Sequence, residues 1–472
     1  MRRTRLAQMA GAVAAALLLM PLSACDEILR VNNPDEISVG ELDDEELLDA
    51  QVAGVLAQFQ DNMAGTEGAM VQGASFLGDE TLTGLNWEDY QRNNQRIVEY
   101  NLGAVFGIWS RMSSIIRLGQ ETLVRLDSLA SNPSSDRRVA LVSALTGYGF
   151  VFIAEHFCQA VIASSADDLD STLLDPDDVY QRAIPHFERA ISVGNAAGAP
   201  NLVNLAHVGL ARAHLALENF ADAIQHAQAV PVGFTYWVEY SDVDSDLYNN
   251  LYDEVRGTNH TIGVHPAFLN GVYEEQPLID GQTDPRVQHT STWSTGHDQS
   301  TKLYKPYQPR RFSGYTGAAI ADGADEGNGD NGDVIFFQRN TNVMLADGVE
   351  ARHHRYEAQL RSGGSEAEVL AFVNVRRAVG NEGPVSLTGD ALFAELRRQR
   401  ALDHFMGGLR LGDLRRWKRQ GIGDFFPTGA HPNPDRPPAV YGPWTCWALP
   451  LEEYEGNPGL QKPVDPTVPP GI

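Results

Sequence analysis

The chain has 472 residues, enough to bury a large core and to form more than one domain. It carries 36 basic and 62 acidic residues, which gives a formal net charge of −26. A surface this acidic repels phosphate backbones, so we expect no nucleic-acid partner.

The first 24 residues have the pattern of a secretory signal peptide. Three arginines, at positions 2, 3 and 5, precede an apolar stretch over 9–20 that is too short to span a bilayer. Leu22-Ser23-Ala24-Cys25 follows and resembles a bacterial lipobox, in which the cysteine is lipidated. We therefore expect removal of residues 1–24 and a palmitate-type lipid anchor on Cys25, which two or more acyl chains make stable. The alternative is an ordinary signal peptide cut near Ala24.

The chain from Cys25 onward has 33 basic and 62 acidic residues, a formal charge of −29. No later segment approaches the roughly 20 apolar residues of a membrane span, so we expect the membrane to be reached through the lipid alone.

Apolar residues at helical spacing predict a mainly α structure. The first expected helices cover residues 42–64, 105–129 and 137–163, and two antiparallel helices follow over 177–193 and 205–230. Alanines along the last two helices allow close packing, and the spacing resembles tetratricopeptide helix pairs. We expect helical pairs over about 105–230 to form one wall of a larger helical body.

Composition changes near Pro231. From there to about Asp333 the chain is rich in Gly, Asp, Asn, Thr and aromatic residues, which predicts a long loop-rich insertion with a few short strands. Its most polar part, 321–333, lacks the spacing of a calcium loop. Helices are expected again over 334–345, 366–379 and 390–419, before a Pro-rich tail that completes one body over residues 25–472.

Two cysteines remain after Cys25. Cys158 and Cys446 form a disulfide in one reading, because an exported protein meets an oxidising compartment. In the other reading they are two separately buried thiols. Sequence alone leaves both open, since it does not show whether the two Cα atoms approach each other.

Several stretches, in order along the chain, resemble the SusD/RagB family of outer-membrane nutrient-binding lipoproteins. The most specific is Leu409–Trp417, which is close to the family signature Arg-x-x-Asp-Leu-Arg-Arg-Trp. The others are the segments 29–35, 333–339 with 343–346, 374–377, 447–453 and 457–460.

The resemblance implies a tetratricopeptide-like scaffold and structural roles for Arg410, Asp413, Arg415, Arg416 and Trp417, through charge-assisted hydrogen bonds and packing. The family usually carries acids along the preceding helix. Here those positions hold Gln399, Asp403 and Gly407, which predicts a weaker ladder of ion pairs.

No catalytic motif supports an enzyme. His353 and His354 point to different helix faces and are expected on a solvated surface, so we expect neither a metal nor a cofactor. Acid pairs such as Glu274-Glu275 do not by themselves establish a glycosidase.

The resemblance implies binding of an oligosaccharide or a peptide and delivery to a SusC-like TonB-dependent channel, with the lipid-anchored protein facing the cell exterior. Aromatic rings that can stack on sugars are the ligand-binding candidates: Trp87, Tyr90, Trp237, Trp293, Tyr304 and Tyr307. Three cations, Lys305, Arg310 and Arg311, either bind acidic ligands or face acidic neighbours. The alternative functions are a tetratricopeptide-type adaptor that binds proteins and a surface glycan hydrolase.

Overall fold

The computed structural model describes residues 41–163, 172–255, 261–269, 284–290, 293–315, 317, 337–433, 438–465 and 467–470. Two compact units divide the chain, Met1–Leu47 and Leu48–Ile472. In the first unit the described residues form two short 3-10 helices, η2 (Glu41–Asp43) and η3 (Glu45–Leu47). Cys25 and the segments 29–35 and 321–333 lie outside the described residues, and so does the expected boundary at residue 25.

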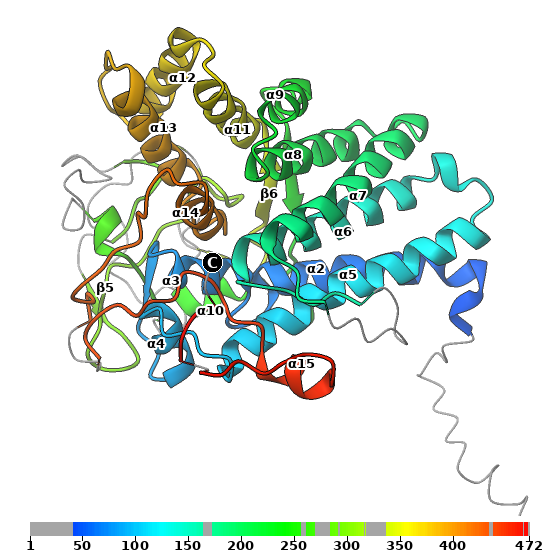
Figure 1. Ribbon diagram of the computed structural model, residues 1–472, viewed down its shortest axis with the longest axis horizontal. Coiled ribbons are helices and arrows are strands. Elements are labelled where there is room, and N and C mark those ends of the chain that lie inside the picture. Colours follow the sequence, from blue (N-terminus) through cyan, green and yellow to red (C-terminus); the bar gives the residue numbers. More distant parts are fainter. Residues whose placement is uncertain are drawn as a thin grey trace, which may run out of the picture. The chain divides into compact units, whose positions relative to one another are not determined.

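The second unit is mainly α-helical, as expected (Figure 1). Its α-helices are α2 (Leu48–Gln60), α3 (Met70–Leu77), α4 (Glu88–Asn94), α5 (Gly103–Leu129), α6 (Arg137–His156), α7 (Pro176–Ala196), α8 (Pro200–Ala216), α9 (Phe220–Ala229), α10 (Leu251–Val255), α11 (Gly348–Arg361), α12 (Glu366–Val379), α13 (Gly389–Asp403), α14 (Arg410–Arg419) and α15 (Leu451–Gly456). The short helical turns are η4 (Asp61–Gly65), η5 (Pro133–Ser135), η6 (Ser245–Leu247) and η7 (Pro266–Phe268). Its strands form three antiparallel pairs: β1 (Thr81–Thr83) with β3 (Ile262–Val264), β2 (Thr235–Val238) with β6 (Val343–Asp347), and β4 (Ser294–Thr295) with β5 (Lys302–Leu303).

Helices α5, α6, α7, α8 and α9 form a row in which each helix packs on the next (Figure 1). Helix α11 then packs on α9 and α8, although about 120 residues separate it from α9 in sequence. The helical scaffold is therefore interrupted by the loop-rich region and resumes after it. Strands β2 and β6 bring the two ends of that region together, with Trp237 opposite Met344.

Four of the expected helices differ from the observed ones. The helix over 137–163 ends at His156, and the helix over 205–230 is divided into α8 and α9 at Glu218, which has a φ of 60°. The helix over 390–419 is divided into α13 and α14 by a tight turn that includes Gly408, with a φ of 76°. Residues 343–345 belong to strand β6, because they pair with β2, and helix α11 begins only at Gly348.

Close packing in the row depends on glycines around Phe187 of α7. A Cβ atom at Gly147 of α6 would lie 2.7 Å from the Phe187 ring, and one at Gly209 of α8 would lie 2.4 Å from it. Both distances are shorter than van der Waals contact, so the three helices approach this closely only with glycine at both positions.

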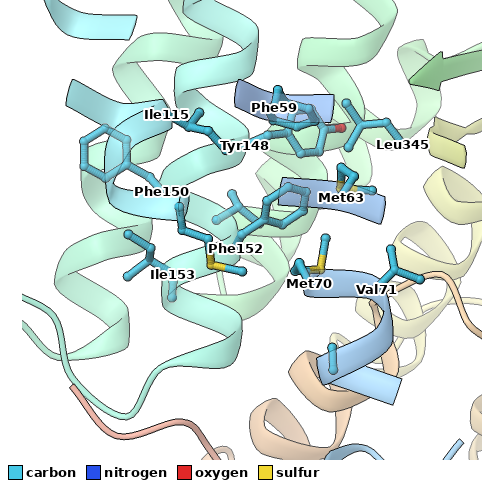
Figure 2. Close-up of a cluster of buried hydrophobic side chains, with 14 of the residues drawn as sticks. Phe59, Met63, Met70, Val71, Ile115, Tyr148, Phe150, Phe152, Ile153 and Leu345 are labelled. Atoms are coloured by element: carbon cyan, nitrogen blue, oxygen red, sulfur yellow. The ribbon is translucent and has the colours of Figure 1, made fainter. Parts of the chain in front are cut away.

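The core joins the row of helices to the N-terminal helices of this unit. Figure 2 shows Phe59, Met63 and Met70 packed against the α6 side chains Tyr148 and Phe152. The expectation that no segment after Cys25 is apolar enough to span a membrane was wrong for α6, which passes by composition and length. However, 94% of its most apolar window is buried inside the structure. It is the central helix of this core.

Cys158 and Cys446 form a disulfide with a Cα–Cα distance of 5.1 Å. Of the two alternatives that the sequence leaves open, the structure has the bridge. Backbone hydrogen bonds flank it: Cys158 N donates to the Trp447 carbonyl, and Trp447 N donates to the His156 carbonyl, both at 2.8 Å. The C-terminal segment is thereby joined to the end of α6.

Asp403, at the end of α13, is the centre of a buried ionic network. Its carboxylate accepts hydrogen bonds from Arg286 Nη1 at 3.1 Å and from Arg376 Nε at 2.8 Å. Burial alone would raise the pKa of Asp403, but Arg376, Arg286 and His353 outweigh it and hold this pKa well below its ordinary value. The side chain is fully buried and ionised, and it joins α13 to α11, α12 and the loop-rich region.

The expectation that ion pairs would be weaker at these helix positions was therefore wrong at Asp403. Gln399 also belongs to the network, because its Oε1 accepts a hydrogen bond from Arg286 Nη1 at 2.8 Å. At Gly407 a Cβ atom would lie 2.9 Å from the side chain of Arg311, so the missing side chain leaves room for that arginine.

The expectation of solvated histidines at 353 and 354 was also wrong. Both side chains are buried, and burial lowers the pKa of each to about 4, so both rings are neutral at pH 7. His353 Nε2 lies 2.7 Å from Asp403 Oδ2, and His354 Nε2 lies 3.4 Å from Glu350 Oε1. Helix α11 packs between α9 and α13, so it has buried polar residues on more than one side.

The Leu409–Trp417 signature has the structural contacts that the resemblance implies. Arg416 Nη2 lies 2.9 Å from a Glu357 oxygen and 3.1 Å from Asp413, while the Trp417 indole N–H donates to Glu357 at 3.0 Å. Arg410 Nε donates to the Gly78 carbonyl at 3.0 Å. These bonds hold α14 against α11 and the end of α3.

We expect Asp403→Asn to lower the free energy of unfolding by about 3–5 kcal/mol, because it leaves buried arginines without their counter-charge. Urea unfolding followed by circular dichroism measures this change. The matched control is Asp390→Asn, an exposed acid on the same helix, with an expected change within about 0.5 kcal/mol. Equal effects of the two substitutions would contradict the role assigned to Asp403.

Candidate ligand-binding site

A cavity between α4 and α5 holds two of the predicted aromatic residues. Its volume is about 500 Å³, within the range of small-molecule sites. Trp87, just before α4, is 55% exposed and lies with its ring centroid 5.9 Å from that of Tyr90. Two of the six predicted aromatic residues therefore line one cavity, which we call the Trp87 cleft.

Charged groups line the same cleft beside the aromatic rings. Glu67 and Arg111 are the most important, because neither is held by a strong partner among the described residues. Among the described residues, Arg111 has one ion pair, a long one with Asp61 (Nε to Oδ2, 3.9 Å), and its buried Nε–H has no acceptor there. Burial raises the pKa of Glu67 and lowers that of Arg111. A ligand hydroxyl group can donate to the Glu67 carboxylate or accept from the guanidinium of Arg111, whose side chain is 21% exposed.

The cleft is positioned by buried asparagines of α4. Asn93 Nδ2 donates to the Gly73 carbonyl at 3.1 Å, while Asn94 Nδ2 donates to the carbonyls of Phe76 and Thr81. Gly68 completes the wall: it has a φ of 69°, and a Cβ atom there would lie 2.5 Å from the Tyr90 hydroxyl oxygen. Trp87 and Tyr90 are thus presented from a helix that is bonded to α3 and β1.

The other predicted aromatic residues lie elsewhere. Trp293 is 47% exposed next to strand β4, where Lys302 Nζ lies 4.7 Å from its ring, and Tyr304 is half-buried against His289. Tyr307 is buried in the hydrophobic core, so its ring offers no open face to a ligand. Trp237 lines a separate cavity of about 350 Å³ beside β2 and β6.

Two of the three predicted cations of the loop-rich region, Arg310 and Arg311, face acidic neighbours. Arg310 Nη1 lies 2.6 Å from Asp347, and Arg311 Nη1 lies 3.1 Å from Glu350. Of the two alternatives for these arginines, the structure has the ion pairs. No group of three or more His, Cys, Asp or Glu side chains in the described ranges is arranged to hold a metal ion.

Sequence reasoning missed Glu67 and Arg111. Glu67 stands in a Gly-Thr-Glu-Gly turn, and Arg111 is a charged residue within a long apolar helix. Neither feature is specific, because turns and partly exposed helices commonly carry charges. Glu67 and Arg111 become part of one site only because this turn lies next to α4 and α5 in the folded chain.

Two buried carboxyl groups lie on the turn between α3 and β1, which precedes the cleft. Burial raises the pKa of Asp79 to about 7 and that of Glu80 to about 8, against the opposing effect of nearby arginines. Glu80 Oε1 accepts a hydrogen bond from Met406 N at 3.0 Å. Around Asp79, the guanidinium groups of Arg96 and Arg410 and the hydroxyl group of Tyr441 lower its pKa, but by less than burial raises it.

These raised pKa values predict how stability depends on pH. Between pH 4 and pH 8 the folded chain holds protons that the unfolded chain has released, so the contribution of both groups falls as pH rises. We expect the stability of Asp79→Asn relative to the wild type to rise by about 1–3 kcal/mol between pH 5 and pH 8, because the wild type loses stability over this range as its buried carboxyl group is forced to ionise. Urea unfolding at the two pH values tests this. The control is Asp242→Asn, an exposed acid, and a benefit of Asp79→Asn that is equal at both pH values would contradict the prediction.

No family model and no curated protein matches the chain in sequence. Solved structures do match. A SusD-like carbohydrate binding protein from Bacteroides fragilis has a TM-score of 0.64 at 13% identity, covering 89% of this chain and 99% of that one.

Two further solved structures are similar. A second Bacteroides fragilis protein, of the SusD superfamily, has a TM-score of 0.63 at 14% identity and covers 89% and 99% of the two chains. A SusD superfamily protein from Bacteroides vulgatus has a TM-score of 0.61 at 14% identity and covers 89% and 98%. These matches span nearly the whole of both chains, and the described helices are those of a mainly α scaffold. The chain therefore has the SusD-like fold.

Proposed function

We propose that this protein is an outer-membrane lipoprotein of the SusD/RagB family that binds an oligosaccharide in the Trp87 cleft and delivers it, unchanged, to a TonB-dependent channel. The cleft carries the proposal. It combines an exposed tryptophan face with two charged groups that lack strong partners. Sugars need this pairing, because their C–H faces stack on aromatic rings while their hydroxyl groups hydrogen-bond to polar neighbours.

The fold supports a carbohydrate as the ligand. A solved structure with this fold is described as a SusD-like carbohydrate binding protein. The lipobox at Leu22–Cys25 supports the membrane anchor, and the acidic Asp26 and Glu27 that follow it support the exterior face of the cell. In this reading the chain is not an enzyme, and the SusC-like channel is its permanent partner.

The ligand site is tested by titrating the protein with maltoheptaose, xylohexaose and mannohexaose in a calorimeter. We expect at least one of these neutral oligosaccharides to bind, and Trp87→Ala to weaken that binding about tenfold or more, as for a truncated aromatic hot spot. Trp293→Ala is the matched control, because this tryptophan is also exposed but lies outside the cleft. Loss of binding in the control alone would place the site on the β4–β5 hairpin instead.

The delivery role is tested by co-purification from detergent-solubilised outer membranes of the native bacterium, with mass spectrometry of the proteins recovered. We expect a TonB-dependent channel in roughly equal amount to the tagged protein. Cys25→Ser is the control for the anchor and should leave the membrane fraction. Recovery of the wild-type protein alone, or with unrelated proteins, would favour the adaptor function over uptake.

A further inference from the structure

A second cavity, beside the disulfide, has a charge opposite to that of the whole chain. Its volume is about 350 Å³, and it shares no lining residue with the Trp87 cleft. Four cations and one acid line it: Arg415, Arg416, Lys418, Arg419 and Glu155. The chain as a whole carries −26, so a locally positive cavity is unusual for it.

Two of these five groups are already neutralised. Both Glu155 oxygens accept hydrogen bonds from Arg212, which lies behind the cavity wall. Arg416 is bound by Glu357 and Asp413. The charge that remains open to a ligand is therefore that of Arg415, Lys418 and Arg419.

Arg415 has no carboxylate partner among the described residues. Its guanidinium donates to backbone carbonyls at the end of α6, at 3.1 Å to Ala154 and 2.8 Å to Phe157. The negative end of that helix compensates part of the charge. Burial lowers the pKa of Arg415 to about 9, which shows that its surroundings compensate the charge less well than water does.

Lys418 and Arg419 have partners that a ligand can replace. Lys418 Nζ lies 3.0 Å from Asp424, and Arg419 Nη1 lies 2.7 Å from Asp177, while Arg419 Nη2 donates to the Ala216 carbonyl at 3.1 Å. The side chains of these two acids are 50% and 61% exposed. Ion pairs with such exposed acids contribute little to the free energy of folding, so a ligand that replaces these acids loses little binding free energy.

Tyr180 supplies a further donor. The residue is 2% exposed and lines the cavity, yet no described residue forms a hydrogen bond with its hydroxyl group. Prolines 176, 443 and 469 give the remaining wall an apolar surface. The cavity therefore offers donors on one side and apolar contact on the other.

We propose that this cavity binds a small organic anion, whose carboxylate or sulfate group lies against Arg415, Lys418 and Arg419. The Tyr180 hydroxyl donates a hydrogen bond to the same group, and the prolines contact the body of the ligand. The volume exceeds that of a bare ion and suits a molecule of about the size of a monosaccharide. This site is independent of the function proposed for the Trp87 cleft.

The test uses three probes built on the same hexose: galacturonic acid, galactose 6-sulfate and galactose. The full-length protein is titrated with each in a calorimeter. We expect at least one anionic sugar to bind with an affinity that falls as sodium chloride rises, and galactose to bind at least tenfold more weakly. The two anionic probes distinguish a carboxylate ligand from a sulfate ligand. Equal binding of all three sugars, or no binding of either anion, would overturn the proposal.

Variants locate the site. The double variant Lys418→Gln with Arg419→Gln should weaken anion binding tenfold or more, and Tyr180→Phe should weaken it several-fold while keeping the ring. Arg415 is left unchanged, because it also holds the end of α6. Arg117→Gln, an exposed arginine of α5 whose side chain is 54% exposed, is the control and should bind as the wild type does. Unchanged binding in the double variant would place the anion elsewhere and contradict the proposal.

Discussion

The structure depends on one buried carboxylate, that of Asp403, and on the cations around it. The acid lies at the end of α13 and is bonded to residues of α11, α12 and the segment around Arg286. An ionised group in a dry interior is stable only when opposite charges surround it. The network therefore links these four parts of the chain and holds the C-terminal helices against the scaffold.

This constraint explains how a row of helices can carry a long irregular region. The row is interrupted after α9, and β2 with β6 closes the gap before α11 returns to pack on α9. Arg310 and Arg311, inside the irregular region, pair with Asp347 and Glu350 at the start of α11. The loops are consequently bonded to the scaffold from within, as an ordered binding surface requires.

Sequence reasoning predicted the parts that depend on local pattern. The mainly α class, the ends of α12 and the tetratricopeptide-like packing follow from apolar periodicity and small residues. Sequence reasoning failed where contacts between segments far apart in the sequence determine the structure. Asp403 was predicted to form weaker ion pairs because its partner Arg286 is 117 residues away in the sequence. His353 was predicted to be solvated because the sequence of α11 does not show that Asp403 of α13 packs against it. Trp87 and Tyr90 were predicted from composition, whereas Glu67 and Arg111 join them only through tertiary contacts.

The central claim is that the Trp87 cleft holds a sugar without transforming it. The most direct measurement incubates the protein with the oligosaccharide that binds most tightly, recovers the sugar after many hours, and determines its mass and its amount. We expect the sugar to return at its original length, after saturable binding that Trp87→Ala weakens. Shortened products that disappear when a cleft carboxylate such as Glu67 is replaced by glutamine would contradict it and make the protein a glycan hydrolase.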